Sequence, residues 1–555
     1  MKQLATTLLV GGLVMVSVSL TGQQAAPDLI LTNGKIITVD DRFSIAQAVA
    51  VRGDRIAAVG TNQEIERLAG PNSRRLDLQG RSVVPGLIDN HAHFQEEGAY
   101  WTLELRLDGV DSRRTALEMI RARAKARGPG AWVYTLGGFS PDQFADDSRP
   151  FTRDELDSVA PDNPVLLQFT RVETYLNSKA IEAVGLDKIA EPWVGRDASG
   201  RPTGVVGDAG AARVRNAAGF LENLPKDIFE ASSMAMLKDL SRAGLTASGG
   251  TCDYEDKYRQ WQREGRLSMR FFCLRTATGG GTGPEGVDKI LAQIPGLKYF
   301  DGDEWMDHVN WGERLYNVVD NVGDTKPMSP PEAFVQWGRV AREVARAGIP
   351  IQIHSTMEWT IEQQLAQVEA VNKEFPVRRL RWAFMHLEGI TPPQIARMKA
   401  LNMFLAVNPR GIISGESFRR IHGDRAYDMP PLQTIQASGI LWGLGTDAFE
   451  VNQYRPFTTL SWAVTGKMVG GKVVIRQPVS REAALIAHTR NNAYLFFREN
   501  DLGSIQTGRL ADLVVIDRDY LTVPADQIKD IRPVTTIVGG RVVFDAATEP
   551  TPSRP

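Results

Sequence analysis

Histidine is scarce in this chain of 555 residues, and four of its seven imidazoles stand where a metal ion can be held. His91 and His93 follow the apolar run 83–88 and lie two residues apart. In an extended segment, side chains two residues apart point to the same side. Two neutral imidazoles placed in this way can share a metal ion at Zn–N distances of about 2.0–2.1 Å. The pair therefore predicts a metal site where a strand ends.

Three more metal-compatible side chains follow short apolar runs further along the chain. His354 and His386 each end such a run, and Asp447 closes a third one, Leu441–Thr446. Each residue then lies at the carboxyl end of a predicted strand. In a (β/α)8 barrel all these ends face one mouth, where active sites are found. We therefore expect the five side chains to meet at that mouth.

The elements that must position these residues occupy the long middle of the chain, residues 81–501. A helix-like stretch, Pro331–Ala347, leads through Gly348 into a short apolar run, and the same order recurs twice more before residue 445. Helix followed by buried strand is typical of a parallel sheet covered by helices, and the length favours a (β/α)8 barrel with insertions. The predicted class is α/β, with a doubly wound open sheet as the alternative.

The two ends of the chain have a different pattern of residues. Residues 28–80 and 502–548 contain short β-rich runs with Gly and Asp between them, which is typical of small antiparallel strands. Strand-rich ends on both sides of a long α/β middle predict one small composite β-sandwich assembled from both termini.

Composition restricts the partner. The chain has 64 Lys and Arg against 66 Asp and Glu, a formal net charge of -2, so no basic field favours nucleic acid or an anionic membrane. We expect a small-molecule substrate and leave a homo-oligomer open.

Two cysteines cannot form a disulfide scaffold, and neither a G-x-S-x-G elbow nor an H-E-x-x-H helix is present.

The first residues predict a targeting segment. Lys2 precedes an apolar run that ends at Leu20 and is followed by small and polar residues, which is the pattern of a secretory signal peptide over residues 1–22. A retained membrane anchor is the alternative reading of this run. We expect removal of the signal, a periplasmic or secreted protein, and no stable membrane association afterwards.

At this point the chain resembles the amidohydrolase superfamily, and within it the YtcJ-like, amidohydrolase-3 branch whose relatives include N-substituted formamide deformylase. The resemblance covers most of the chain after the signal segment. The motifs that carry it are Val84-Pro85-Gly86-Leu87-Ile88-Asp89-Asn90-His91-Ala92-His93, His354, His386, Gly445-Thr446-Asp447, Pro161-Asp162-Asn163-Pro164-Val165, Asn177-Ser178-Lys179-Ala180, Arg201-Pro202-Thr203-Gly204-Val205 and Gly508-Arg509-Leu510-Ala511-Asp512-Leu513-Val514.

The resemblance implies a (β/α)8 barrel with one or two divalent ions, zinc foremost, and a composite β-sandwich. Members with two ions need an anionic bridge from the fourth strand, a carboxylated lysine or a glutamate. Glu313 is our choice for this bridge, with Lys298 and Lys326 as competitors. The implied metal ligands are thus His91, His93, Glu313, His354, His386 and Asp447.

Two positions depart from the branch pattern and weaken any transfer of substrate identity. Ser355 follows His354 where the branch usually has a Gly-Asp pair, and the branch's histidine before Asn177 is missing. His308 is read as a polar wall or structural residue, and His422 and His488 as structural or surface residues. Four aromatic side chains are weak candidates for the substrate pocket: Trp101, Trp132, Phe139 and Trp359.

These residues predict a metal-dependent amidohydrolase that cleaves a non-peptide C–N bond, in an amide, formamide or cyclic amide. A bound divalent ion lowers the pKa of water to about 7, and Asp447 then acts as the catalytic acid–base group, a role that commonly contributes about 10²–10⁴-fold. A one-metal deaminase or an esterase on the same scaffold is an alternative, with Glu358 as proton donor. A non-catalytic, metal-stabilised binding protein is another.

Overall fold

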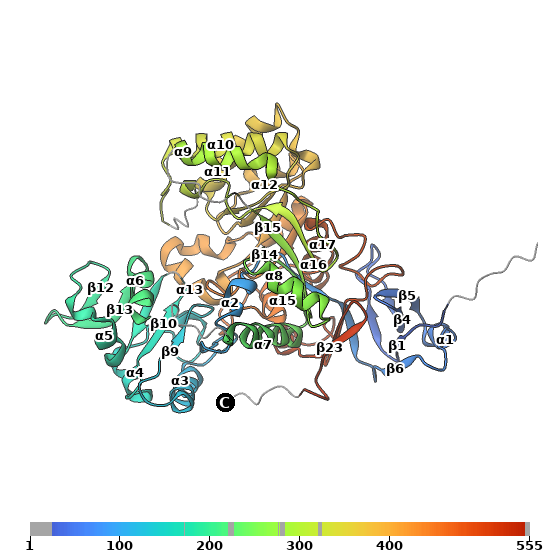
Figure 1. Cartoon of the computed structure of the whole chain (residues 1–555), viewed down its shortest axis with the longest axis horizontal. Coiled ribbons are helices and arrows are strands. Elements are labelled where there is room, and N and C mark those ends of the chain that lie inside the picture. The colour runs from blue at the N-terminus through green and yellow to red at the C-terminus, as the bar shows by residue number, and fades with distance from the viewer. Residues whose placement is uncertain are drawn as a thin grey trace, which may run out of the picture.

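The computed structural model describes residues 25–170, 172–219, 227–275, 277, 284–319 and 325–549. Within these residues the chain is an α/β protein, in which parallel strands alternate with helices and smaller sheets lie beside them (Figure 1). The predicted signal segment falls outside the described residues. In the described part of the chain, no helix combines the length and the apolarity needed to cross a bilayer.

Eight parallel strands position the candidate site. They form two four-stranded sheets, in the orders β8-β14-β15-β16 and β17-β18-β19-β20. A parallel bridge between Trp311 and Ile351 connects the two sheets, and the Trp311 N–H donates to the Pro350 carbonyl at 2.7 Å. The strands are β8 (Leu87–Asp89), β14 (Leu245–Thr251), β15 (Arg270–Arg275), β16 (Met306–Trp311), β17 (Gln352–Ser355), β18 (Ala383–His386), β19 (Phe404–Val407) and β20 (Trp442–Leu444).

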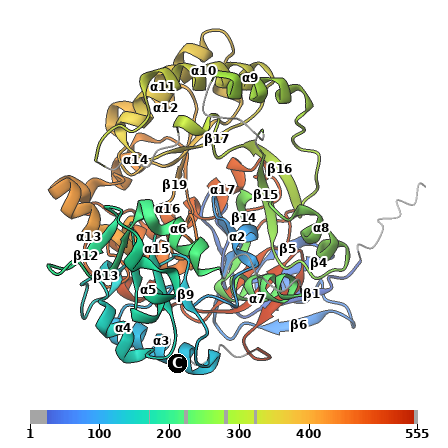
Figure 2. The same cartoon turned by 60° about the vertical axis from the view of Figure 1, so that its left-hand side comes forward.

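Helices follow these strands in the order that the sequence predicted. The predicted helix Pro331–Ala347 is α10 (Pro331–Arg346), which buries Phe334, Trp337 and Val344 along one face. Figure 2 shows α9 to α12 side by side above the strands. The helices are α7 (Ile228–Ala243), α8 (Glu255–Arg263), α9 (Pro284–Gln293), α10, α11 (Glu358–Asn372), α12 (Pro392–Ala400), α13 (Gly411–His422), α14 (Leu432–Ser438), α15 (Pro456–Thr465), α16 (Arg481–Ala487) and α17 (Arg490–Leu495).

The bounds of one strand differ from the prediction. The apolar run 349–353 predicted a strand that ends at His354, whereas β17 begins at Gln352 and ends at Ser355. Pro350 has no N–H to donate to a neighbouring strand, so regular pairing starts only beyond it. His354 is consequently the second-last residue of the strand rather than the last.

Strands from both ends of the chain share one sheet. Its order is β23-β22-β21-β7-β2-β3, and β21 pairs with β7 so that Leu513 lies opposite Pro85. A second sheet, β5-β4-β1-β6, comes from the N-terminal part alone. The strands are β1 (Leu29–Thr32), β2 (Lys35–Ile37), β3 (Ile45–Ala46), β4 (Ala48–Arg52), β5 (Arg55–Gly60), β6 (Arg74–Asp77), β7 (Ser82–Pro85), β21 (Leu513–Ile516), β22 (Pro533–Val538) and β23 (Arg541–Asp545).

A fifth sheet, which the sequence did not single out, is inserted between β8 and β14. Its order is β12-β13-β11-β10-β9, and it forms the lobe at the left of Figure 1 with its own apolar core. Its elements are α3 (Arg113–Arg127), β9 (Val133–Thr135), α4 (Arg153–Val159), β10 (Val165–Phe169), β11 (Glu173–Leu176), α5 (Ser178–Val184), β12 (Val194–Arg196), β13 (Pro202–Gly207) and α6 (Asp208–Ala218).

Two long-range connections fix the parallel strands to their surroundings. The Arg270 guanidinium at the start of β15 donates to both carboxylate oxygens of Asp512, at 2.8 and 3.0 Å, and both side chains are buried. Cys252, just after β14, forms a disulfide with Cys273 in β15. The two cysteines, from which the sequence predicted no cysteine chemistry, therefore cross-link neighbouring strands.

Candidate metal centre

Six predicted side chains converge at the carboxyl ends of the parallel strands. They come from five strands that are far apart in the sequence, so the convergence is a property of the fold. His91 and His93 follow β8, Glu313 follows β16, His354 lies in β17, His386 ends β18 and Asp447 follows β20.

Glu313 lies among three imidazoles. Its Oε1 is 2.9 Å from His354 Nδ1, 3.5 Å from His386 Nε2 and 3.7 Å from His91 Nε2. Lys298 and Lys326, the competitors for the bridging position, are both exposed. All three imidazole nitrogens therefore face the same carboxylate oxygen, which could hold a cation together with them.

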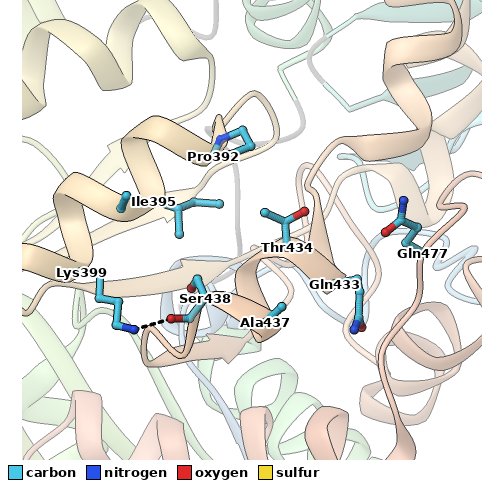
Figure 3. Close-up of a pocket in the computed structure, with 9 residues that line it drawn as sticks. Pro392, Ile395, Lys399, Gln433, Thr434, Ala437, Ser438 and Gln477 are labelled. Atoms are coloured by element: carbon cyan, nitrogen blue, oxygen red, sulfur yellow. Dashed lines mark hydrogen bonds between the residues drawn. The ribbon is translucent and has the colours of Figure 1, made fainter.

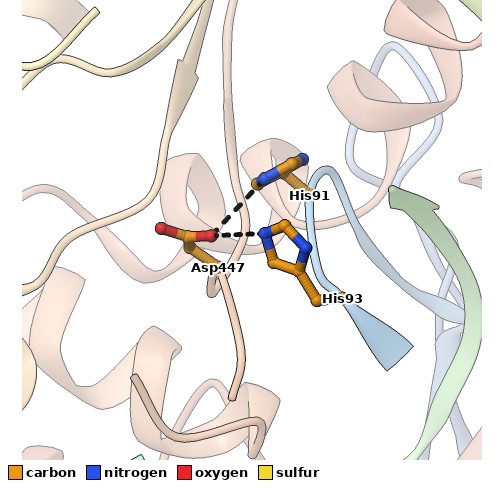
Figure 4. A group of neighbouring side chains, drawn as sticks. All are labelled: His91, His93 and Asp447. Carbon is orange, nitrogen blue, oxygen red and sulfur yellow. Dashed lines mark ion pairs between the residues drawn. The ribbon is translucent and has the colours of Figure 1, made fainter. Parts of the chain in front are cut away.

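Asp447 occupies the corresponding place on the other side of His91. Figure 4 shows its carboxylate facing both His91 and His93, with Oδ1 3.4 Å from His91 Nε2 and 3.3 Å from His93 Nε2. Asp447 Oδ2 is 3.5 Å from His386 Nδ1. Two groups of three ligand atoms each lie within 4.8 Å of one another: His91, His93 and Asp447, and His91, Glu313 and His386.

The backbone at two of these residues has an unusual conformation. His386 has φ of 70° and Asp447 has φ of 58°, in the left-handed region that non-glycine residues seldom adopt. Such residues persist only where the surrounding structure holds them, and they gather at functional sites. At Asp447 the holding contact is a hydrogen bond from its own N–H to the His91 carbonyl, 2.8 Å long.

A buried polar layer beneath the site fixes the strand ends. The Asp89 carboxylate accepts hydrogen bonds from the N–H of His91 and from the N–H and hydroxyl of Thr446. Gly445 packs against this layer so closely that a Cβ there would lie 2.2 Å from Asn90 Oδ1 and 2.5 Å from Asp89 Oδ1. These supporting residues were not among the predicted ones, although Asp89 and Thr446 stand beside predicted ligands in the motifs.

The electrostatics of the six residues favour ionised carboxylates. Burial alone would raise the pKa of Asp447, but the imidazoles of His386, His91 and His93 hold it far below its usual range. The pKa of Glu313 is lowered in the same way by His354 and His386, again against the effect of burial. Both groups are therefore anionic at neutral pH and suited to a cation.

The imidazoles also fit a metal. The ring nitrogens of His91 and His386 are buried and make no well-formed hydrogen bond to the described residues. Burial lowers the pKa of His386, which favours the neutral form that coordinates a metal. Buried nitrogen atoms without a well-formed hydrogen bond are costly, and a bound ion would satisfy them. Four imidazoles and two carboxylates form a donor set that Zn²⁺ accepts.

The remaining predicted residues lie outside this group. His308 contacts Arg275 at 2.7 Å and Glu255 at 3.3 Å, which is a structural role. Glu358 is the first residue of α11 and forms an ion pair with Arg425. His488 is fully buried at the end of α16. His422 is half-buried at the end of α13.

The four aromatic candidates for the pocket lie in apolar cores or at their edges. Phe139 is fully buried in the core of the inserted lobe, against which Trp132 is half-buried. Trp101 packs against Phe449 with ring centroids 4.9 Å apart, and Trp359 packs beside Met357.

A separate surface groove of about 620 Å³ lies between α12 and α14. Figure 3 shows its lining, in which Lys399 donates to the carbonyl of Ser438. The groove is lined by apolar, amide and hydroxyl side chains and this one lysine, without a carboxylate or an imidazole. It therefore offers no metal ligands, and the convergent strand ends remain the candidate site.

The strand arrangement and this group of ligands define a hydrolase with a metal site. The chain belongs to the amidohydrolase family, whose family model matches residues 74–544, and it is accordingly a hydrolase that acts on carbon–nitrogen bonds. It is 29% identical to N-substituted formamide deformylase of Arthrobacter pascens, over 93% of this chain and 98% of that protein. It is 23% identical to the putative amidohydrolase YtcJ of Bacillus subtilis, over 92% and 98%.

Solved structures agree on the fold. An uncharacterized metal-dependent hydrolase from Pyrococcus furiosus superposes with a TM-score of 0.60 at 22% identity, over 89% of this chain and 100% of that one. Atrazine chlorohydrolase TrzN from Arthrobacter aurescens, complexed with zinc, superposes with a TM-score of 0.54 at 16% identity, over 93% and 95%.

Proposed function

We propose that this protein is an exported, metal-dependent hydrolase that cleaves a non-peptide C–N bond in an amide, a formamide or a cyclic amide. The convergence of six ligand-type side chains from five strand ends carries the proposal. The likeness to N-substituted formamide deformylase over nearly the whole chain places formamides first among the substrates to test. The eight parallel strands are proposed to close into a (β/α)8 barrel over residues 81–501, with residues 28–80 and 502–548 as a composite β-sandwich.

His91, His93, Glu313, His354, His386 and Asp447 would hold one or two divalent ions, zinc first. When bound, such an ion polarises the scissile carbonyl and lowers the pKa of a water molecule to about 7. Glu313, with three imidazoles around one oxygen, is the proposed bridge between two ions. The support for this role is its central position among the donors.

Asp447 is the proposed proton carrier. Its carboxylate lies at the end of the last parallel strand, beside His91 and His93, where it can accept a proton from the attacking water at one oxygen. It then delivers that proton to the nitrogen of the leaving amine as the C–N bond breaks. The same residue thus acts first as general base and then as general acid.

Export is supported by two observations. Residues 1–22 have the charge and hydropathy pattern of a secretory signal. Cys252 and Cys273 form a disulfide, which is typical of proteins that fold in an oxidising compartment. A periplasmic or secreted location is consistent with both.

Metal analysis combined with an amidase assay tests the proposal. The purified mature protein should contain one or two divalent ions per chain by elemental mass spectrometry. Formate and amine should be released from N-substituted formamides, with cyclic amides assayed in parallel. Chelation should abolish turnover, and zinc should restore it. Undiminished turnover by the metal-free protein would contradict the proposed mechanism.

Matched histidine variants locate the metal. His91→Asn and His386→Asn should each lose metal and activity, because both imidazoles belong to the candidate groups. His422→Asn, at the end of α13, serves as the control and should keep both. Ammonia release from aromatic amines without amide turnover would instead favour a deaminase. The ion pair of Glu358 with Arg425 gives that alternative no support.

A further inference from the structure

A second cavity, distinct from the candidate metal centre, lies where four parts of the chain meet. The segment before α3, the end of α7, the start of α15 and the start of β22 with the residues before it enclose a volume of about 250 Å³. None of the six candidate metal ligands lines it. Four of its twelve lining residues are arginines.

The charged groups of the lining are unequal in number. Four guanidinium groups and two carboxylates line the cavity: Arg106, Arg242, Arg455, Arg532, Asp108 and Asp239. Arg106 also pairs with Glu104, so four positive groups meet three negative ones and positive charge remains in excess. Both carboxylates already have an arginine partner. Arg106 donates to the two oxygens of Asp108 at 2.9 and 3.0 Å, and Arg242 is paired with Asp239.

Arg455 is a lining arginine whose guanidinium has no charged partner among the described residues. It is half-buried, and its guanidinium makes no hydrogen bond or ion pair to any residue that the structure describes. The group packs close to Gly109, where an added Cβ would lie 2.8 Å from Arg455 Nη1. An arginine held against the backbone in this way keeps its N–H groups available to a ligand.

Two further features of the lining favour an anion. Arg455 immediately precedes α15, a helix of ten residues, so the positive end of the helix dipole lies at the cavity. The Nε–H of Arg242 is buried and has no acceptor among the described residues. Buried donors of this kind are usually satisfied by a partner, and a bound anion would supply the acceptor that the described residues do not.

We propose that this cavity binds a small oxyanion of the phosphate or carboxylate class, with Arg455 as its principal ligand. A guanidinium presents paired N–H groups that match the oxygens of a phosphate or a carboxylate. The volume is slightly below the roughly 300–1,000 Å³ of pockets for drug-sized ligands, which restricts the occupant to a small anion.

Calorimetric titration of the full-length mature protein tests the proposal, with inorganic phosphate and succinate as separate probes at constant ionic strength. At least one probe should bind saturably with one site per chain. Arg455→Gln should weaken this binding about tenfold or more, since a charge-assisted pair is lost. Arg339→Gln is the control, because Arg339 is an exposed arginine of α10 that pairs with Asp288.

Anions also bind to metal ions, so each titration is repeated after chelation. Binding at the cavity should persist in the metal-free protein with the same affinity, whereas binding at the metal centre should disappear. The proposal is overturned if neither probe binds saturably at concentrations up to about 10 mM. A Kd of about this size lies near the weak end of specific recognition. It is also overturned if Arg455→Gln, with an unchanged circular dichroism spectrum, binds as tightly as the parent protein.

Discussion

The hydroxyl of Thr446 donates a hydrogen bond of 2.6 Å to the carboxylate of Asp89, and this contact joins the last parallel strand to the first. The two residues are 357 positions apart in the sequence. Each stands next to candidate ligands, because Asp89 precedes His91 by two residues and Thr446 precedes Asp447 by one. The geometry of the candidate metal centre therefore depends on two residues, Asp89 and Thr446, that are not themselves candidate ligands.

Thr446→Val should loosen this connection while keeping the shape of the side chain. The variant leaves one buried oxygen of Asp89 without its donor, which costs about 1–3 kcal/mol of unfolding free energy. We also expect weaker metal binding, since the segment that carries Asp447 loses a fixed contact. Denaturant unfolding and metal titration measure the two effects. Thr522→Val removes the same kind of bond, from a hydroxyl to Asp519, at an exposed position. If both variants behave alike, the Asp89 contact has no special role.

Asp447→Asn separates metal binding from proton transfer. The amide keeps the size of the carboxylate and one oxygen, so most of the bound metal should remain. The proton carrier is lost, and kcat should fall by about 10²–10⁴-fold. Metal content and kcat are measured on the same preparation, with Asp424→Asn as a control because Asp424 is exposed in a short 3-10 helix after α13. Near-normal kcat in Asp447→Asn would disprove the assigned role.

The candidate ligands could be predicted from sequence because their signals are local. His91, His354, His386 and Asp447 each follow or end a short apolar run, and a strand end is recognisable from the residues around it. Their convergence then follows from the general rule that the carboxyl ends of parallel strands meet. To predict that the ligands converge, it is enough to assume that these strands belong to one continuous set of parallel strands.

Features that depend on distant partners could not be predicted in this way. The pairing of Cys252 with Cys273 requires β14 and β15 to be neighbours, which neither cysteine indicates by itself. The inserted sheet between β8 and β14 consists of short strands that resemble other short strands in the chain. Asp89 looks like any carboxylate that ends a strand until Thr446 is placed beside it.

Arg270→Met should destabilise the protein strongly, because it leaves the Asp512 carboxylate buried without its partner. Breaking a buried ion pair on one side typically costs about 3–5 kcal/mol of unfolding free energy. Arg270→Met combined with Asp512→Leu should recover part of the loss. Recovery stays incomplete because Asp512 also accepts the N–H of Gly539 at 2.8 Å. Arg266→Met, at an exposed ion pair with Glu230, should hardly change the denaturation midpoint. Equal effects of Arg270→Met and Arg266→Met would contradict the importance of burial.

The disulfide should make stability dependent on redox conditions. Cys252 and Cys273 are separated by 21 positions, and a cross-link closing a loop of this size stabilises a protein by roughly 3 kcal/mol. Cys252→Ser combined with Cys273→Ser should lower the unfolding free energy by about this amount. A reductant should lower the parent protein to the same level and leave the double variant unchanged. Thiol alkylation followed by mass spectrometry should detect no free thiol in the native, unreduced protein.

His488 should make the folded state weaker in mild acid. Burial lowers the pKa of this imidazole from its ordinary 6.5 to about 4 in the folded protein. Between pH 6.5 and pH 4 the unfolded chain binds a proton at His488 that the folded chain does not, so unfolding is favoured as the pH falls.

Over this pH range the contribution of His488 amounts to roughly 3 kcal/mol lost, since one pKa unit corresponds to about 1.4 kcal/mol. His488→Gln removes this titration. The unfolding free energy of the parent, relative to that of the variant, should therefore fall as the pH is lowered from 6.5 to 4 and should stay constant above pH 6.5. Denaturant unfolding at several pH values measures this difference. A difference that does not change with pH would show that His488 takes up its proton equally well in the folded and unfolded chain.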